Sequence, residues 1–243
     1  MNEGASLRFL SLEQCLGLRR GYLVTVNMQH IYEARRSTFV SDAIFHDPGA
    51  HHCLDGRGAV GLFRRIIPGD LPLVQGNVVI ERWLMEAGAA RLLVIGSNQS
   101  IVRQVAEQYP DVVLIVDDSI IRIGTEEDAQ RWAAVLAVRH PGPWDLIAIA
   151  LGVPKQEVLA RALQHRLDAP IFCLGGSFEI IADVLPRSPE TFQRLGLEGL
   201  WRLVMEPSRK RWERLVRSYA SFFALRARAP SLERLTGRGK NDG

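Results

Sequence analysis

Short apolar runs that end at a glycine or a polar residue, most of them followed by a segment with helical spacing, constrain the fold of this chain most strongly. The runs cover residues 22–26, 91–95, 112–116, 147–151 and 171–174. Strands that alternate with helices predict an α/β fold with a parallel sheet, whose ligands bind at the C-terminal ends of the strands. The residues that end four of these runs should therefore lie along one edge of the sheet. They are Gly96, Asp117, Gly152 and Gly175.

The run at residues 147–151 leads into the most informative turn of the chain. Gly152 permits a sharp exit from the strand, and Pro154 suits the first turn of a helix, where its missing N–H costs nothing. A helix N-terminus with Lys155 beside it is suited to binding a phosphate or a diphosphate. The alternative is an ordinary strand–helix turn in which the polar residues 155–157 are solvated.

Helix starts are also marked in the sequence. Thr125 and Asp128 have capping-box spacing and predict a helix that ends at about Arg139. Ser97 or Asn98 is expected to cap a helix that ends near residue 108.

A carboxylate follows another short apolar segment. Asp55 comes after residues 51–54 and before Gly56, so we expect its side chain at a strand end with a turn beyond it. The alternative is that Asp55 and Gly56 serve only as turn residues. The histidines and the cysteine at positions 51–53 do not indicate a metal site, because adjacent residues of a strand point to opposite faces.

The composition is typical of a globular protein in a reducing compartment. Of the 243 residues, 47% are hydrophobic and 23% are charged, which suits one large or two small domains. The three cysteines are odd in number and widely spaced, which argues against a disulfide framework. The N-terminus has no basic segment leading into an apolar one, and no apolar run approaches the roughly 20 residues of a membrane span. We therefore expect a cytoplasmic protein that does not span a membrane.

Longer motifs follow one another in a specific order. They are Thr25-Val26-Asn27, Asp55-Gly56-Arg57-Gly58, LGVPKQE at 151–157, GGSFEII at 175–181 and RLGLEGLWRLVMEP at 194–207. In this order they resemble the WecG/TagA/CpsF family of bacterial glycosyltransferases, over roughly residues 21–219. The resemblance implies a Rossmann-like core and a C-terminal appendage that helps to complete the site. It also implies inverting transfer of one sugar from a nucleotide donor, usually UDP-linked, to a polyprenyl-diphosphate-linked acceptor.

The resemblance also assigns roles to individual residues. Asp55 matches the family's aspartate and would be the general base that takes the proton of the acceptor hydroxyl. The residues expected to contact substrate are Thr25, Asn27, Gly152, Lys155, Gln156, Gly175, Gly176, Glu179 and Arg209. Cationic side chains and helix dipoles, rather than a metal, would stabilise the leaving diphosphate. No cofactor is therefore expected, and no metal ligands are assigned.

The chain departs from the family pattern near residue 73. Many members have an arginine where this chain has Leu73, in the element Leu73-Val74-Gln75-Gly76. Arg57 could supply the missing charge, although a solvated position suits it equally well. Asp117 and Asp118 resemble the acidic metal-binding cluster of other glycosyltransferases, and the alternative is a strand end with solvated carboxylates.

The C-terminal part predicts a basic amphipathic helix. Aromatic and apolar residues recur at helical spacing over residues 212–223, among many arginines. Such a helix suits an anionic membrane surface or an acidic partner, and the alternative is a terminal helix packed on the core. The residues expected at the membrane or partner surface are Arg211, Trp212, Arg214, Arg217, Phe222 and Phe223.

These observations predict four regions along the chain. They are an N-terminal extension (1–20), a Rossmann-like catalytic domain (21–190), a helical appendage for active-site closure and membrane contact (191–229) and a disordered tail (230–243). The expected partners are a UDP-sugar, a polyprenyl-diphosphate-linked glycan and the anionic inner face of the cytoplasmic membrane. A homo-oligomer is left open.

Other functional classes fit the sequence less well. Residues 96–98 read Gly-Ser-Asn and lack the GxGxxG fingerprint of a dinucleotide-binding oxidoreductase. Nucleic-acid binding is not indicated, because the net charge is only +3 and no recognition motif accompanies the arginines. The alternative is a catalytically inactive, membrane-associated scaffold of a polysaccharide assembly complex. Leu73 favours that alternative, and the retention of Asp55 and Lys155 argues against it.

Overall fold

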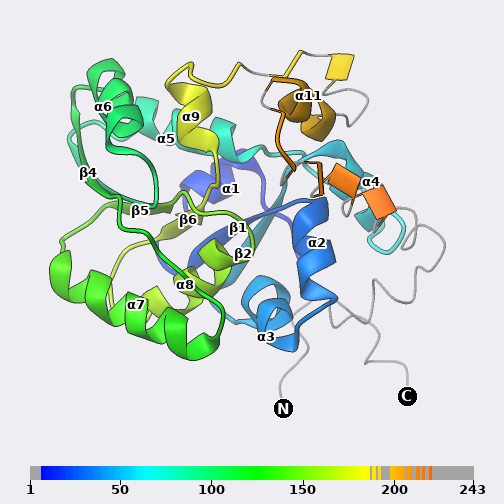
Figure 1. The fold of residues 1–243 in the computed structure, drawn as a ribbon, viewed down its shortest axis with the longest axis horizontal. Helices are drawn as coiled ribbons and strands as arrows, with labels where there is room; N and C mark the ends of the chain where they lie inside the picture. The colour runs from blue at the N-terminus through cyan, green and yellow to red at the C-terminus, as the bar shows by residue number, and fades with distance from the viewer. Residues whose placement is uncertain are drawn as a thin grey trace.

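A six-stranded, all-parallel sheet forms the centre of the computed structural model (Figure 1). The structure describes residues 7–186, 188–189, 191–192, 198–205, 207–209, 212–213, 215–216 and 219–220. In spatial order the strands are β2 (Ala50–Leu54), β1 (Tyr22–Val26), β6 (Ile171–Cys173), β5 (Leu146–Ile149), β3 (Ala90–Ile95) and β4 (Val112–Asp117). The α/β fold with a parallel sheet that the sequence predicts is confirmed.

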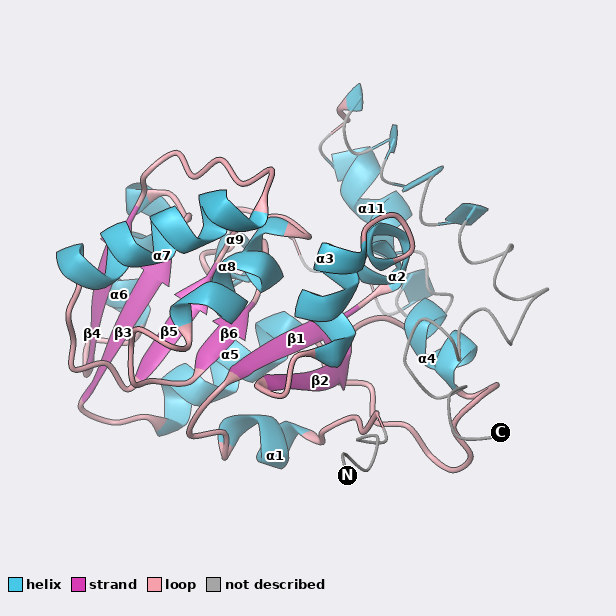
Figure 2. Ribbon diagram, turned by 90° about the horizontal axis from the view of Figure 1, so that it is seen from below, coloured by secondary structure: helices cyan, strands magenta, loops and turns pink. Residues whose placement is uncertain are grey.

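Helices cover both faces of this sheet, as Figure 2 shows for α7 and α8 on one side and α1 and α5 on the other. One face carries α2 (Met28–Ala34), α3 (Thr38–Ser41), the π-helical segment η1 (Asp42–His46), α4 (Arg57–Phe63), α7 (Glu126–Arg139) and α8 (Lys155–Leu163). The other face carries α1 (Leu12–Leu16), α5 (Gly76–Glu86), α6 (Gln99–Gln108) and α9 (Ser177–Ile181). Successive strand residues point to opposite faces, and helices cover both faces. Every residue of β1 and β5 is therefore buried.

Local signals set most helix starts as expected. Thr125 and Asp128 form the predicted capping box at the start of α7, and Asn98 is the N-cap of α6. Pro154 lies at the N-cap position of α8, one residue before the first helical turn in which we expected it. The strand before it, β5, ends at Ile149, two residues earlier than the apolar run suggests.

The two ends of the described chain contact different parts of the molecule. Phe9 forms a parallel bridge with His52, and α1 buries Cys15 in the cluster that also contains α5. Near the C-terminus, α11 (Glu198–Met205) is held by a bond from the Trp201 indole N–H to the Pro186 carbonyl at 3.3 Å. Figures 1 and 2 both show α11 on the side of the molecule that carries α2 and α4. The region boundaries at residues 20, 190 and 229 stay predictions.

Candidate active site

Every predicted site residue of the core follows or ends one of four consecutive strands, β2, β1, β6 and β5. Asp55 follows β2, and Thr25 and Asn27 lie at the end of β1. The remaining ones follow β6 and β5: Gly175, Gly176 and Glu179 after the former, and Gly152, Lys155 and Gln156 after the latter. Because all the strands are parallel, the predicted residues gather at one edge of the sheet.

Asp55 is held at this edge by its backbone. Its N–H donates to the Val26 carbonyl at 2.8 Å, which continues the β1–β2 pairing by one residue beyond Leu54. Gly56 then takes φ of +92°, a conformation that side chains disfavour, and α4 begins at Arg57. The carboxylate of Asp55 is therefore placed at a strand end just before a turn, as predicted, and the residue is partly exposed.

Two polar residues of β1 fix the neighbouring part of the edge. Thr25 is buried, and its hydroxyl donates to the Cys173 carbonyl of β6 at 3.0 Å. Asn27 is partly exposed and caps α2, because its Oδ1 accepts the Gln29 N–H at 3.0 Å. Both side chains thus have structural partners, and their contact with substrate stays a prediction.

Some residues at the start of α8 and in the turn before it are exposed, and others are buried. Gly152 and Lys155 are exposed, whereas Gln156 is 2% exposed and Glu157 is fully buried. The Gln156 amide donates to Glu157 Oε1 at 2.6 Å, and its own oxygen accepts the Gly175 N–H at 2.9 Å. A fully solvated polar turn, the alternative that the sequence left open, is therefore wrong for these two residues.

The turn after β6 is shaped by its glycines. Gly175 takes φ of +54° and donates its N–H to Gln156, so the turns after β6 and β5 are joined directly. Gly176 is the N-cap of α9, and a Cβ placed there would lie 3.5 Å from Glu179 Oε2. Glu179 thus lies against the turn, on the first part of α9.

The segment in which the resemblance implies an arginine at position 73 borders the same edge. Leu73 forms a parallel bridge with Leu54, the residue before Asp55, and is 40% exposed. A Cβ at Gly76, where α5 begins, would come within 3.2 Å of the Thr25 methyl group. The bridge to Leu54 places position 73 near Asp55. Arg57 is exposed on the first turn of α4.

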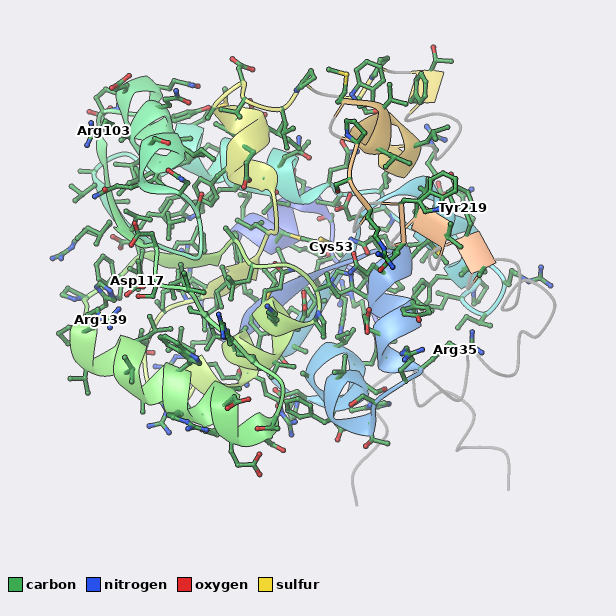
Figure 3. All side chains as sticks on the ribbon, viewed as in Figure 1. Arg35, Cys53, Arg103, Asp117, Arg139 and Tyr219 are labelled. Carbon is green, nitrogen blue, oxygen red and sulfur yellow. The ribbon has the colours of Figure 1, made fainter. Side chains whose placement is uncertain are left out.

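Asp117 lies at the opposite end of the sheet, at the end of edge strand β4. Figure 3 shows it beside Arg139 and far from Cys53, which lies on β2. The Asp117 carboxylate accepts hydrogen bonds from Arg139 at 2.7 Å and from His140 at 2.8 Å. Burial alone would raise the pKa of Asp117, but hydrogen bonds from Ser119, His140 and Arg139 together hold it well below its usual range.

The solvated strand end expected for Asp117 and Asp118 does not describe Asp117. Its side chain is 3% exposed and ion-paired, so the expected solvated strand end is correct only for the exposed Asp118. Across the part of the chain that the structure describes, no group of three or more His, Cys, Asp or Glu side chains is placed to hold a metal ion.

The predicted appendage is described only in part. Arg209 is largely exposed, and its Nε lies 3.1 Å from Glu213. Trp212 is 57% exposed, and residues 212–213, 215–216 and 219–220 are helical. Arg211, Arg214, Arg217, Phe222 and Phe223 lie outside the described residues. No helix among the residues described is long and apolar enough to cross a membrane.

The sequence reasoning missed two residues of this edge, His30 and Glu157. They form a fully buried pair with 2.8 Å between His30 Nε2 and Glu157 Oε1. A signal for His30 exists, because it stands three residues after Asn27, the spacing of a capping box, and Asn27 N–H lies 3.2 Å from its Nδ1. The partner of His30 could not be found locally, since it is 127 residues away in sequence.

Polar side chains that gather after four adjacent parallel strands lie where α/β proteins bind their ligands. The sequence model of the glycosyl transferase WecG/TagA/CpsF family matches residues 8–235 of this chain. The chain belongs to this family and is a glycosyltransferase. The match confirms the resemblance and extends it beyond residues 21–219, and it implies a sugar donor and a glycan acceptor in general.

Proposed function

We propose that this protein is an inverting glycosyltransferase that moves one sugar from a UDP-sugar to a polyprenyl-diphosphate-linked acceptor in surface polysaccharide biosynthesis. The observation that carries the proposal is the partly exposed carboxylate of Asp55 at the same sheet edge as Thr25, Asn27 and Lys155. Family membership supports the reaction class. The identity of the donor, the acceptor and the pathway is part of the proposal.

In the proposed reaction Asp55 takes the proton of the acceptor hydroxyl as its oxygen attacks the anomeric carbon of the donor. A new bond forms between that carbon and the acceptor oxygen, while the bond to the UDP oxygen breaks on the opposite face. The electron pair of the broken bond leaves with UDP, and one general base suffices for inversion. Asp55→Asn would keep the shape of the side chain and remove its capacity to accept this proton.

The leaving diphosphate needs positive charge, and the start of α8 can supply it. Lys155 is the first residue of this helix and is exposed, and the backbone amides there also favour an anion. We propose that these groups stabilise the UDP leaving group without a metal. Gln156 and Gly175 would form the wall beside them, since their hydrogen bond joins the two turns.

The appendage is the proposed site of membrane contact at the inner face of the cytoplasmic membrane. Trp212 and Val216 are helical residues whose exposed fractions are 57% and 49%. The sequence around them is rich in arginine. Exposed apolar groups beside positive charge suit the interface of an anionic membrane. Such docking would place the site near a lipid-linked acceptor.

The direct test of the function is a transfer assay with the purified full-length protein. The donors are a panel of UDP-sugars, the acceptor is a short-chain polyprenyl-diphosphate-linked oligosaccharide, and products are identified by mass spectrometry with and without EDTA. We expect an acceptor that gains one sugar unit, in equal yield in EDTA. A product that disappears in EDTA would contradict metal independence, and turnover that required another nucleotide would contradict the UDP assignment.

A catalytically inactive scaffold is the second candidate, and Leu73 is the observation that favours it. This residue replaces the family's arginine directly beside the strand that carries Asp55. A scaffold would bind membranes but would neither hydrolyse a UDP-sugar nor transfer its sugar. The absence of both reactions with every donor, together with vesicle binding, would replace the first proposal by this one.

A further inference from the structure

His30 and Glu157 form a buried polar pair directly beneath the predicted substrate edge. Both side chains are 0% exposed, and His30 Nε2 lies 2.8 Å from Glu157 Oε1. His30 comes from α2, the helix after β1, and Glu157 from α8, the helix after β5. Since Nδ1 accepts the Asn27 N–H, Nε2 is the ring nitrogen that donates to Glu157.

The pair is the middle of a continuous chain of hydrogen bonds. On one side, His30 Nδ1 lies 3.2 Å from the backbone nitrogen of Asn27 and 3.0 Å from its Oδ1. On the other side, Glu157 Oε1 accepts the Gln156 amide at 2.6 Å, and Gln156 accepts the Gly175 N–H at 2.9 Å. The chain thus connects three residues that the sequence predicts to contact substrate, and these follow three different strands.

Stability does not account for this arrangement. Glu157 Oε2 is buried without a hydrogen-bond partner among the described residues, and a buried carboxylate oxygen in that state is unfavourable. Replacing a buried ion pair by apolar residues of similar volume is often neutral or stabilising. A contact between α2 and α8 that served stability alone would therefore not require the two polar side chains.

We infer that His30 and Glu157 are positioning residues of the transfer site. They hold the Asn27 cap of α2 and the Gln156–Gly175 link between two turns in one fixed arrangement. Because both are fully buried, they act through these neighbours and do not touch substrate themselves. A reacting group displaced by about 1 Å can cost about 100-fold in rate, which is the scale of effect that positioning residues control. The inference rests on the proposed function, in that the site they shape is the one that binds the UDP-sugar.

The central test replaces the whole pair by apolar residues, as His30→Leu with Glu157→Met in the full-length protein. We expect kcat with the UDP-sugar to fall about 100-fold at a temperature where circular dichroism shows the variant fully folded. We also expect a melting temperature close to that of the wild type. A kcat within about twofold of the wild type would overturn the inference, because the pair would then be structural only.

Three further variants separate positioning from folding. Glu157→Gln keeps an oxygen that can accept both hydrogen bonds, so we expect it to retain most of kcat. An equal loss in this variant would contradict a role through the acceptor oxygen.

Asp47→Asn is the matched control, because Asp47 pairs with Arg161 on the same helix α8, at 3.0 Å, away from the predicted edge. It should lower the melting temperature and leave kcat unchanged. If the double variant does not fold, His30→Gln, which keeps an N–H donor for Glu157 but removes Nδ1 from Asn27, answers the same question.

Hydrogen exchange distinguishes failure of this inference from failure of the proposed function. The Gly175 amide, protected by Gln156, should exchange faster in the double variant than in the wild type and at the wild-type rate in Asp47→Asn. A wild-type protein that transfers no sugar would overturn the proposed function, and the exchange result would then decide the positioning role by itself. Unchanged exchange at Gly175 would overturn the inference even in an active enzyme.

Discussion

At the scale of single residues, the two acidic side chains at strand ends differ in what they can do. Asp117 is buried and accepts hydrogen bonds from Arg139 and His140, so its charge is already balanced. Asp55 is partly exposed at the end of β2, beside the turn that Gly56 makes possible. A general base must reach a proton of the acceptor, and only the position of Asp55 combines access with the predicted substrate contacts of β1.

Asp55→Asn should therefore reduce transfer strongly while leaving donor binding intact. The amide keeps the size of the side chain but cannot take a proton, so we expect kcat to fall by about 100- to 10,000-fold. Donor affinity, measured by calorimetry with the UDP-sugar, should change by less than about twofold. The matched control is Asp118→Asn, the same substitution at the exposed residue that follows β4, and it should turn over normally. Turnover of Asp55→Asn near the wild-type rate would rule out Asp55 as the base.

At the scale of elements, the helices show which sequence signals are local and which are not. The Thr125–Asp128 capping box was predictable because both partners lie within one turn of the same helix. The burial of Gln156 and Glu157 was not, because their partners Gly175 and His30 lie elsewhere in the chain and their polar sequence is equally typical of a solvated helix start. The burial of these two side chains depends on tertiary contacts between residues far apart in the chain.

The C-terminal segment is the element whose removal tests the proposed membrane contact. A chain that ends at Ser208 loses Trp212 and every arginine after residue 208, and each basic residue near an anionic surface adds about 1 kcal/mol. We expect its binding to anionic vesicles, measured by sedimentation, to fall at least about tenfold, and its transfer to a lipid-linked acceptor to fall with it. The control is the 243-residue protein on neutral phosphatidylcholine vesicles, which it should bind as weakly as the truncated chain binds anionic vesicles. An unchanged distribution between supernatant and pellet would contradict the interfacial role.

At the scale of the whole molecule, strand order is what the sequence could not provide. The alternation of runs and helices predicted a parallel sheet and a common edge, and both are present. It did not predict that β6 lies between β1 and β5, so that Cys173 accepts the Thr25 hydroxyl while Gly175 donates its N–H to Gln156. That order depends on crossover connections between distant segments, for which short apolar runs carry no signal. The predicted substrate residues lie at the ends of adjacent strands only because of this order.

The proposed transfer uses one general base, Asp55, at the edge formed by β2, β1, β6 and β5. The most direct measurement of this claim is the configuration of the transferred sugar in the product, read from its anomeric proton coupling by nuclear magnetic resonance. Direct displacement by the acceptor predicts a product whose anomeric configuration is opposite to that of the UDP-sugar donor. A product with the configuration of the donor would contradict single displacement with Asp55 as the base.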